Sequence, residues 1–180
     1  MFGKNPILKK HTLPIGGSLL VREVFPTIQG EGPLSGTPAT FIRLAGCNLR
    51  CHFCDTDFDV EKAHIKSVEE LVYACVQYKN KLIVLTGGEP LMQEVGPLIV
   101  ALRNKGMYVQ IETAGSVWPE SLTDEVLGTS STVIVVSPKT PIIHWRVFET
   151  ASAFKYLVSA SSEYNDQGIP ITHTQHKGGV

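Results

Sequence analysis

Three cysteines in one short segment are the residues best suited to carry out chemistry. Cys47, Cys51 and Cys54 lie within residues 46–56, GCNLRCHFCDT, with the spacing C-x3-C-x2-C. A closed structural zinc site uses four protein ligands, and so does an iron–sulfur cluster that is ligated entirely by protein. Three thiolates with no fourth cysteine nearby therefore favour a cubane cluster in which one iron is open to a reactant.

The fourth cysteine, Cys75, lies in a predicted helix over residues 67–78. Ser67 and Glu70 form a capping-box pattern at its start. The apolar residues that follow have the spacing of one buried helix face: Val68, Leu71, Val72, Cys75 and Val76. We therefore expect Cys75 to pack in the core. The clustering of the other three cysteines favours a cluster or metal site in a reducing cytoplasm over two disulfides in a secreted protein.

Four predicted strands each run directly into a polar motif. They are residues 40–45 before the cysteines, 81–85 before TGGEP, 107–111 before ETAG and 132–136 before SPK. In parallel α/β folds, binding groups gather at the carboxyl ends of the strands. We therefore expect the four motifs to meet on one rim. A fifth strand is predicted over residues 154–158, and Pro90 is expected to begin a helix that ends near Gly106.

A glycine-rich segment precedes the first of these strands. Residues 27–38, TIQGEGPLSGTP, predict a loop that presents Gln29 and Glu31, with a plain surface loop as the alternative. Residues 57–66 look like a polar connection. Arg43 lies inside the first apolar strand, where it could clamp a ligand carboxylate or form a structural salt bridge.

Composition limits the class of protein. The chain has 180 residues, 43% hydrophobic, with 16 basic and 17 acidic residues. It fits one domain over residues 1–180, with an irregular arm at 1–17 and a polar tail at 160–180. The balanced charge gives no basis for binding nucleic acid or a membrane surface. The apolar runs are too short to span a bilayer, and we see no signal peptide, so we expect a cytoplasmic protein.

The cysteine spacing, Phe53 before the third cysteine, and the later GGEP together resemble the radical S-adenosylmethionine (SAM) superfamily. The resemblance implies a [4Fe–4S] cluster held by Cys47, Cys51 and Cys54. SAM would chelate the open iron, and one-electron cleavage would give a 5′-deoxyadenosyl radical. The implied fold is α/β, a partial, open, parallel-stranded TIM-like barrel with few helices.

A narrower resemblance covers roughly residues 25–158. TIQGEG and CDT, together with TGGEPL, ETAG and SPK, look like the 7-carboxy-7-deazaguanine synthase family. This implies a lyase that converts 6-carboxy-5,6,7,8-tetrahydropterin to 7-carboxy-7-deazaguanine with loss of ammonia, in queuosine and 7-deazapurine biosynthesis. It also implies catalytic SAM, Mg²⁺, an electron donor such as flavodoxin or ferredoxin, and a homodimer.

The family motifs imply a role for each matching residue. SAM would contact Phe53, Cys54, Asp55, Gly87, Gly88, Glu89, Glu112, Ser137, Pro138 and Lys139. The pterin would contact Ile28, Gln29, Gly30, Glu31, Arg43 and Thr86. Thr56 would ligate Mg²⁺, which prefers hard oxygen ligands.

The sequence departs from the family pattern after the fifth strand. The family continues with a further strand and a closing C-terminal segment, whereas residues 161–180 are polar and contain His173, His176 and Lys177. We expect a minimal or truncated version with a solvated tail.

The alternatives are a glycyl-radical activating enzyme and a non-catalytic iron–sulfur or zinc domain. TIQGEG and CDT speak against the first. For the second, His52 follows Cys51 directly, which makes a four-ligand zinc site difficult.

Overall fold

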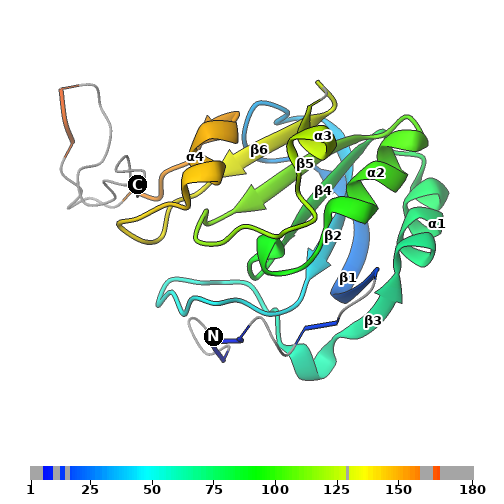
Figure 1. Ribbon diagram of the computed structural model, residues 1–180, viewed down its shortest axis with the longest axis horizontal. Helices are drawn as coiled ribbons and strands as arrows, with labels where there is room; N and C mark the ends of the chain where they lie inside the picture. The colour runs from blue at the N-terminus through cyan, green and yellow to red at the C-terminus, as the bar shows by residue number, and fades with distance from the viewer. Residues whose placement is uncertain (1–5, 10–12, 15–16, 129, 159–163, 167–180) are drawn as a thin grey trace.

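A single sheet organises the molecule. The computed structural model describes residues 6–9, 13–14, 17–128, 130–158 and 164–166. Within them, the sheet has the strand order β3-β1-β2-β4-β5-β6-β7 (Figure 1). The strands are β1 (Ser18–Ile28), β2 (Pro38–Leu44), β3 (His64–Ser67), β4 (Leu82–Gly87), β5 (Tyr108–Thr113), β6 (Thr132–Val136) and β7 (Ala153–Phe154). Strands β2, β4, β5, β6 and β7 are parallel, while β1 is antiparallel to β2 and β3. The predicted α/β class with a mostly parallel open sheet is confirmed.

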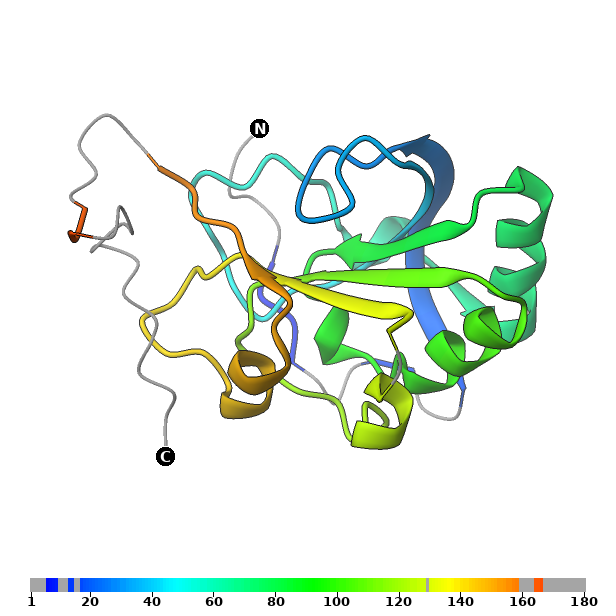
Figure 2. The ribbon, with the colours of Figure 1, turned by 90° about the horizontal axis from the view of Figure 1, so that it is seen from above.

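Few helices accompany this sheet. They are α1 (Val68–Tyr78), α2 (Gly96–Asn104), α3 (Asp124–Leu127) and α4 (Trp145–Thr150), with short 3₁₀ turns η2 (Val60–Lys62) and η3 (Pro90–Met92). In Figure 2 the helices lie on one side of the sheet, and the blue loop of residues 29–37 lies on the other. We call the helix-free side the inner face and the loop the β1–β2 loop. In the described part of the chain, no helix has the length and hydropathy needed to cross a bilayer.

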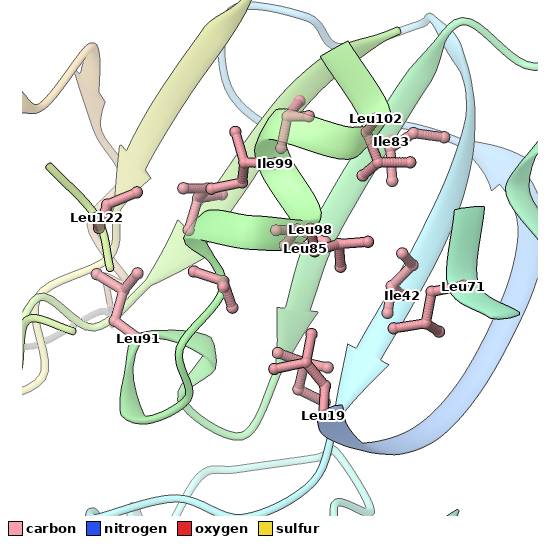
Figure 3. Packing of buried hydrophobic residues seen from close by; sticks show 14 of the residues in the cluster. Leu19, Ile42, Leu71, Ile83, Leu85, Leu91, Leu98, Ile99, Leu102 and Leu122 are labelled. Atoms are coloured by element: carbon pink, nitrogen blue, oxygen red, sulfur yellow. The ribbon is translucent and has the colours of Figure 1, made fainter. Parts of the chain in front are cut away.

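The main core lies between the sheet and the helices. Alternate residues of β2 and β4, including Ile42, Ile83 and Leu85, point toward α1 and α2 and are fully buried (Figure 3). Leu71 of α1 and Leu98 of α2 meet them there. Each such side chain contributes about 1.5–3 kcal/mol of burial free energy. This core fixes the strand directions and hence the rim where the strands end.

Helix α1 follows its predicted pattern with one exception. The Ser67 side chain accepts a hydrogen bond from the Glu70 N–H, and the Glu70 carboxylate accepts one from the Ser67 N–H, so the capping box is confirmed. Cys75 is fully buried, as expected for core packing. Val76 was expected on the same face but is 42% exposed, because the core contacts only the side of α1 that carries Leu71 and Cys75.

The inner face carries polar groups near the strand ends. Ala39, Leu82 and Val84 form a small apolar cluster lower on the strands. Above it, Arg43 of β2 lies beside Thr86 of β4 in the sheet register. Strand β5 continues this row with Glu112, because Leu85 pairs with Ile111 one residue earlier. The inner face therefore changes from apolar to polar toward the carboxyl ends.

Several element boundaries differ from prediction for identifiable reasons. Strand β1 extends to Ile28, since antiparallel pairing continues as far as Pro38. The polar connection at residues 57–66 contains β3, which pairs with β1. Pro90 begins η3 rather than α2, and the Gln93 side chain between them bonds to the backbone of Leu20. Strand β7 has only two residues instead of the expected 154–158.

The predicted polar tail falls mostly beyond the structure. Apart from residues 164–166, residues 160–180 lie outside the described part of the chain. His173, His176 and Lys177 are among them, so the expectation of a solvated tail stays a prediction.

Candidate active site at the carboxyl ends of the strands

The four strand-end motifs and the β1–β2 loop enclose one cavity of about 550 Å³. Seventeen of the nineteen residues named from the sequence line it, and the exceptions are Glu89 and Pro138. Those that line it are Ile28, Gln29, Gly30, Glu31, Arg43, Cys47, Cys51, Phe53, Cys54, Asp55, Thr56, Thr86, Gly87, Gly88, Glu112, Ser137 and Lys139. The expected convergence of these motifs on one rim is therefore present in the structure.

The cysteine loop, residues 46–56, forms one wall of this cavity. Cys47, Cys51 and Cys54 are free thiols. Burial raises the pKa of the Cys47 thiol to about 12, although the Leu49 N–H donates to its sulfur at 3.4 Å. A buried thiolate therefore needs a cation beside it. A cluster provides this, because its irons bind cysteine as thiolate.

The donor set distinguishes a cluster from a single zinc ion. Among the described residues, no three Cys, His, Asp or Glu side chains are grouped closely enough to hold one metal ion. The cysteines of an iron–sulfur cluster bind different iron atoms, so they need not converge on one point. Three soft donors on one wall of a cavity therefore fit a [4Fe–4S] cluster better than a zinc site.

Two glycines let the end of β4 press against the cysteine loop. A methyl group at Gly87 would lie 2.0 Å from the Leu44 carbonyl oxygen, and one at Gly88 would lie 2.0 Å from the Gly46 oxygen. Hydrogen bonds run from the Gly88 N–H to Leu44 O, 3.1 Å, and from the Glu89 N–H to Gly46 O, 2.9 Å. Only glycine permits such close backbone approach. The TGGEP turn thus forms a floor joined directly to the cysteine wall.

Glu89 lies beneath this floor rather than in the cavity. Its buried carboxylate accepts hydrogen bonds from the Thr113 hydroxyl at 2.6 Å, the Ala114 N–H at 2.8 Å and the Leu91 N–H at 3.0 Å. Burial raises the pKa of Glu89, and these three donors oppose that rise. The structure therefore places the carboxylate as a connection between the TGGEP and ETAG turns, and the SAM contact expected of Glu89 stays a prediction.

A second carboxylate, Glu112, connects residues from three elements on the inner face. It accepts hydrogen bonds from the Gln29 side-chain amide at 2.8 Å and from the Thr86 hydroxyl at 3.1 Å. Gln29 is almost fully buried, and its backbone closes the β1–β2 loop through bonds with Gly36 and Thr37. Glu112, which was expected to approach SAM, therefore holds Gln29 and Thr86, which were expected to bind the pterin.

Arg43 forms a structural salt bridge, which was the alternative to a ligand clamp, and it also lines the cavity. Its Nε donates to the Glu23 carboxylate at 2.6 Å, and its guanidinium lies 5.6 Å from the centre of the Phe25 ring. The pair is only partly shielded from solvent, so it contributes modestly to stability. Because the side chain also lines the cavity, its role as a carboxylate clamp stays a prediction.

Two lysines provide positive charge at the far side of the cavity. Lys139 donates to the Ser137 carbonyl oxygen at 3.0 Å, and its ammonium lies 5.9 Å from the centre of the Phe53 ring. Burial lowers the pKa of Lys139, and the nearby Lys155 lowers it further. Lys155 was missed in the sequence. The predicted strand over residues 154–158 placed it inside a strand, whereas β7 ends at Phe154 and makes Lys155 a strand-end residue.

Hard oxygen ligands follow the last cysteine. The Thr56 hydroxyl donates to the Asp55 carboxylate at 3.1 Å, and both residues line the cavity. These oxygens suit Mg²⁺. The Asp57 carboxylate accepts a hydrogen bond from the Asp59 N–H and forms ion pairs with Lys62 and Arg22. These contacts anchor the segment and lower the pKa of Asp57 to about 2.

Comparison with known proteins gives independent evidence on the family of this chain. The Radical SAM superfamily profile matches residues 41–172. The 7-carboxy-7-deazaguanine synthase of Rhodospirillum rubrum is 45% identical over 99% of this chain and 74% of its own length. That of Hyperthermus butylicus is 45% identical over 73% of this chain and 56% of its own length, so the chain spans little more than half of that relative.

A solved structure gives the same result for the fold. The crystal structure of QueE from Escherichia coli superposes with a TM-score of 0.65 and 29% identity, over 77% of this chain and 70% of that one. The profile match and the identity across nearly the whole chain together show that it belongs to the 7-carboxy-7-deazaguanine synthase family of radical SAM enzymes.

Proposed function

We propose that this chain is the radical SAM lyase that converts 6-carboxy-5,6,7,8-tetrahydropterin to 7-carboxy-7-deazaguanine with loss of ammonia, in queuosine and 7-deazapurine biosynthesis. One observation carries the proposal. A single cavity has three free thiols on one wall and the network of Gln29, Thr86 and Glu112 on another. It thus offers soft metal ligands and polar contacts for a heterocycle in the same space.

Cys47, Cys51 and Cys54 would hold the [4Fe–4S] cluster, with SAM on its open iron. When bound, the cluster supplies the single electron that cleaves SAM to a 5′-deoxyadenosyl radical. The protein's task is then to position both reactants and exclude water. The buried Cys47 and the closed floor beneath it suit that task.

The SAM side of the cavity combines backbone and charge. Gly87 and Gly88 line the cavity at the end of β4, where they would contact the methionine moiety. Burial lowers the pKa of Lys139, whereas a ligand carboxylate beside it would favour the charged form and accept a charge-assisted hydrogen bond from it. Phe53 would provide an apolar surface next to that ammonium.

The pterin side combines a fixed polar row with a covering loop. Gln29 and Thr86 both donate hydrogen bonds to the Glu112 carboxylate, so the orientation of all three is set before a substrate arrives. Arg43 would pair with the substrate carboxylate through its remaining guanidinium nitrogens. Thr56 would contribute a hydroxyl oxygen to Mg²⁺, with substrate and water as the other ligands.

The remaining parts of the proposal come from the family. They are an electron donor such as flavodoxin or ferredoxin, assembly as a homodimer, and a cytoplasmic location. The free thiols of the described residues are compatible with a reducing compartment.

The deciding experiment is anaerobic reconstitution followed by assay with reductant, SAM, Mg²⁺ and the carboxytetrahydropterin. We expect the deazaguanine and ammonia to form, with SAM regenerated. If SAM is cleaved while the pterin is untouched, the substrate assignment fails and the superfamily chemistry stands. Stoichiometric zinc without iron in anaerobically purified protein would refute both. Removing Mg²⁺ should reduce turnover without loss of iron.

A further inference from the structure

An ion pair across the cavity joins two segments that are far apart in the sequence. Glu31 belongs to the β1–β2 loop, and Lys155 follows β7, 124 residues later. The Lys155 ammonium donates to the Glu31 carboxylate, and both residues line the cavity. The Glu31 side chain is 44% exposed and the Lys155 side chain is 33% exposed, so solvent screening weakens the ion pair.

The position of Lys155 is fixed by its own backbone. Its N–H donates to the Val136 carbonyl oxygen at 2.7 Å, and the preceding Phe154 is paired with Val136 in the sheet. The Phe154 ring also packs 5.9 Å from that of Phe148. The ammonium therefore starts from a backbone held by β6 and β7.

The β1–β2 loop packs against β6, the strand that also holds the Lys155 backbone. A methyl group at Gly32 would lie 2.8 Å from the side chain of Val135, which shows how closely the loop approaches β6. On the other side, Gln29 bonds to Glu112 at 2.8 Å, and the Gln110 amide reaches the Glu31 carbonyl oxygen at 3.4 Å. The loop thus has one anchor on β5 and a second at Lys155.

We propose that Lys155 is a positioning residue that, through Glu31, holds the β1–β2 loop against the inner face of the sheet and so sets the geometry of the pterin subsite. The ligand's identity rests on the proposed function, whereas the anchoring of the loop does not. In this arrangement Gln29 makes the first anchor, on β5, and Glu31 makes the second, with Lys155. Losing the Lys155 anchor leaves Gln29 bonded to Glu112 but allows the loop to open beyond it.

The first test needs no cofactor. Hydrogen exchange is measured at the Gln29 and Gly36 amides, which bond to Thr37 O and Gln29 O within the loop. We expect Lys155→Met to speed their exchange about two- to fivefold, the range for losing a partly exposed ion pair. Lys155→Arg should restore wild-type exchange, and Glu31→Gln should match Lys155→Met.

A matched control removes an equivalent charge elsewhere. The Arg146 side chain is 36% exposed and pairs with Asp124 at 3.3 Å, outside the cavity. Arg146→Met should leave the loop amides unchanged. Unaltered exchange in Lys155→Met, or equal acceleration in Arg146→Met, would overturn the proposal. If Lys155→Met does not fold, Glu31→Gln removes the same pair and decides the question.

The second test uses the reconstituted enzyme. Lys155→Met should raise KM for the carboxytetrahydropterin about two- to fivefold and should not raise KM for SAM, because removing the Lys155 charge favours the charged form of Lys139. The double variant with Glu31→Gln should be no worse than Glu31→Gln alone, because both changes remove one interaction. An additive loss, or an equal rise in KM for SAM, would refute the proposal. A wild-type enzyme that forms no deazaguanine would refute the proposed function instead, while the exchange result still judges the anchor.

Discussion

The sharpest prediction concerns Gly88, where the TGGEP turn meets the cysteine loop. In Gly88→Ala the new methyl group would lie 2.0 Å from the Gly46 carbonyl oxygen and 3.0 Å from Cys47 Cβ. Backbone must therefore move, and the hydrogen bond from the Glu89 N–H to Gly46 is lost. Overpacking costs about 1–3 kcal/mol, and a buried hydrogen bond left unmade costs about 1–3 kcal/mol more. We expect a loss of about 2–6 kcal/mol, a large part of the total stability of a domain.

The assay combines urea unfolding of the cluster-free protein with iron content after anaerobic reconstitution. Gly88→Ala should unfold at lower urea and retain little iron, because the shift displaces Cys47. Gly106→Ala is the control. Gly106 has φ +71, but a methyl group there would meet no atom within 4 Å among the described residues beyond its chain neighbours. The control therefore measures only the conformational cost, about 1–2 kcal/mol. Wild-type stability and full iron content in Gly88→Ala would refute the steric argument.

Three further predictions follow from individual contacts. Cys51→Ala should abolish cluster assembly, whereas Cys75→Ala should keep the iron content and cost about 1 kcal/mol of stability; equal iron loss in both would contradict the assignment. Thr113→Val should destabilise by about 1–3 kcal/mol, since it removes a donor from the buried Glu89 carboxylate, and Thr113→Ser should recover most of this in thermal unfolding. The pKa of Asp57 is lowered from 3.8 to about 2, so its contribution to stability is present above pH 3.8 and lost as the pH falls toward 2. Asp57→Asn should cost less than about 1 kcal/mol at neutral pH because the group is exposed, and its difference from wild type should vanish below about pH 2.

Local sequence patterns were enough to predict several of the elements that position the strand-end motifs. Strand β6 has the predicted bounds of residues 132–136, and α1 starts at its predicted capping box. Strand β3 was missed because its sequence, HIKS, has no apolar alternation, and it exists through pairing with β1. Helix α4 had no prediction, since it is a short element that Val147 attaches to the core. Both depend on tertiary contacts that periodicity does not contain.

The location of the site could be predicted because each motif lies at the carboxyl end of a parallel strand, where binding groups gather. That rule locates backbone positions, but it does not determine which way a carboxylate turns. Glu89 sits in the predicted motif yet points into the protein, because three donors are available there and the glycines before it occupy the cavity side. Lys155 depended on where β7 ends, which no local signal marks.

Strand alternation explains how one segment supports both halves of the site. Consecutive residues of a strand point to opposite faces, and Glu112 and Thr113 are consecutive in β5. Glu112 turns to the inner face and holds Gln29 and Thr86, the residues proposed to bind the pterin. Thr113 turns the other way and holds Glu89, which fixes the turn that forms the floor under the cysteines. A shift in β5 would therefore move the floor under the cysteines and the row of Gln29, Thr86 and Glu112 together, so the distance between these two parts of the cavity is set by the sheet rather than by the loops.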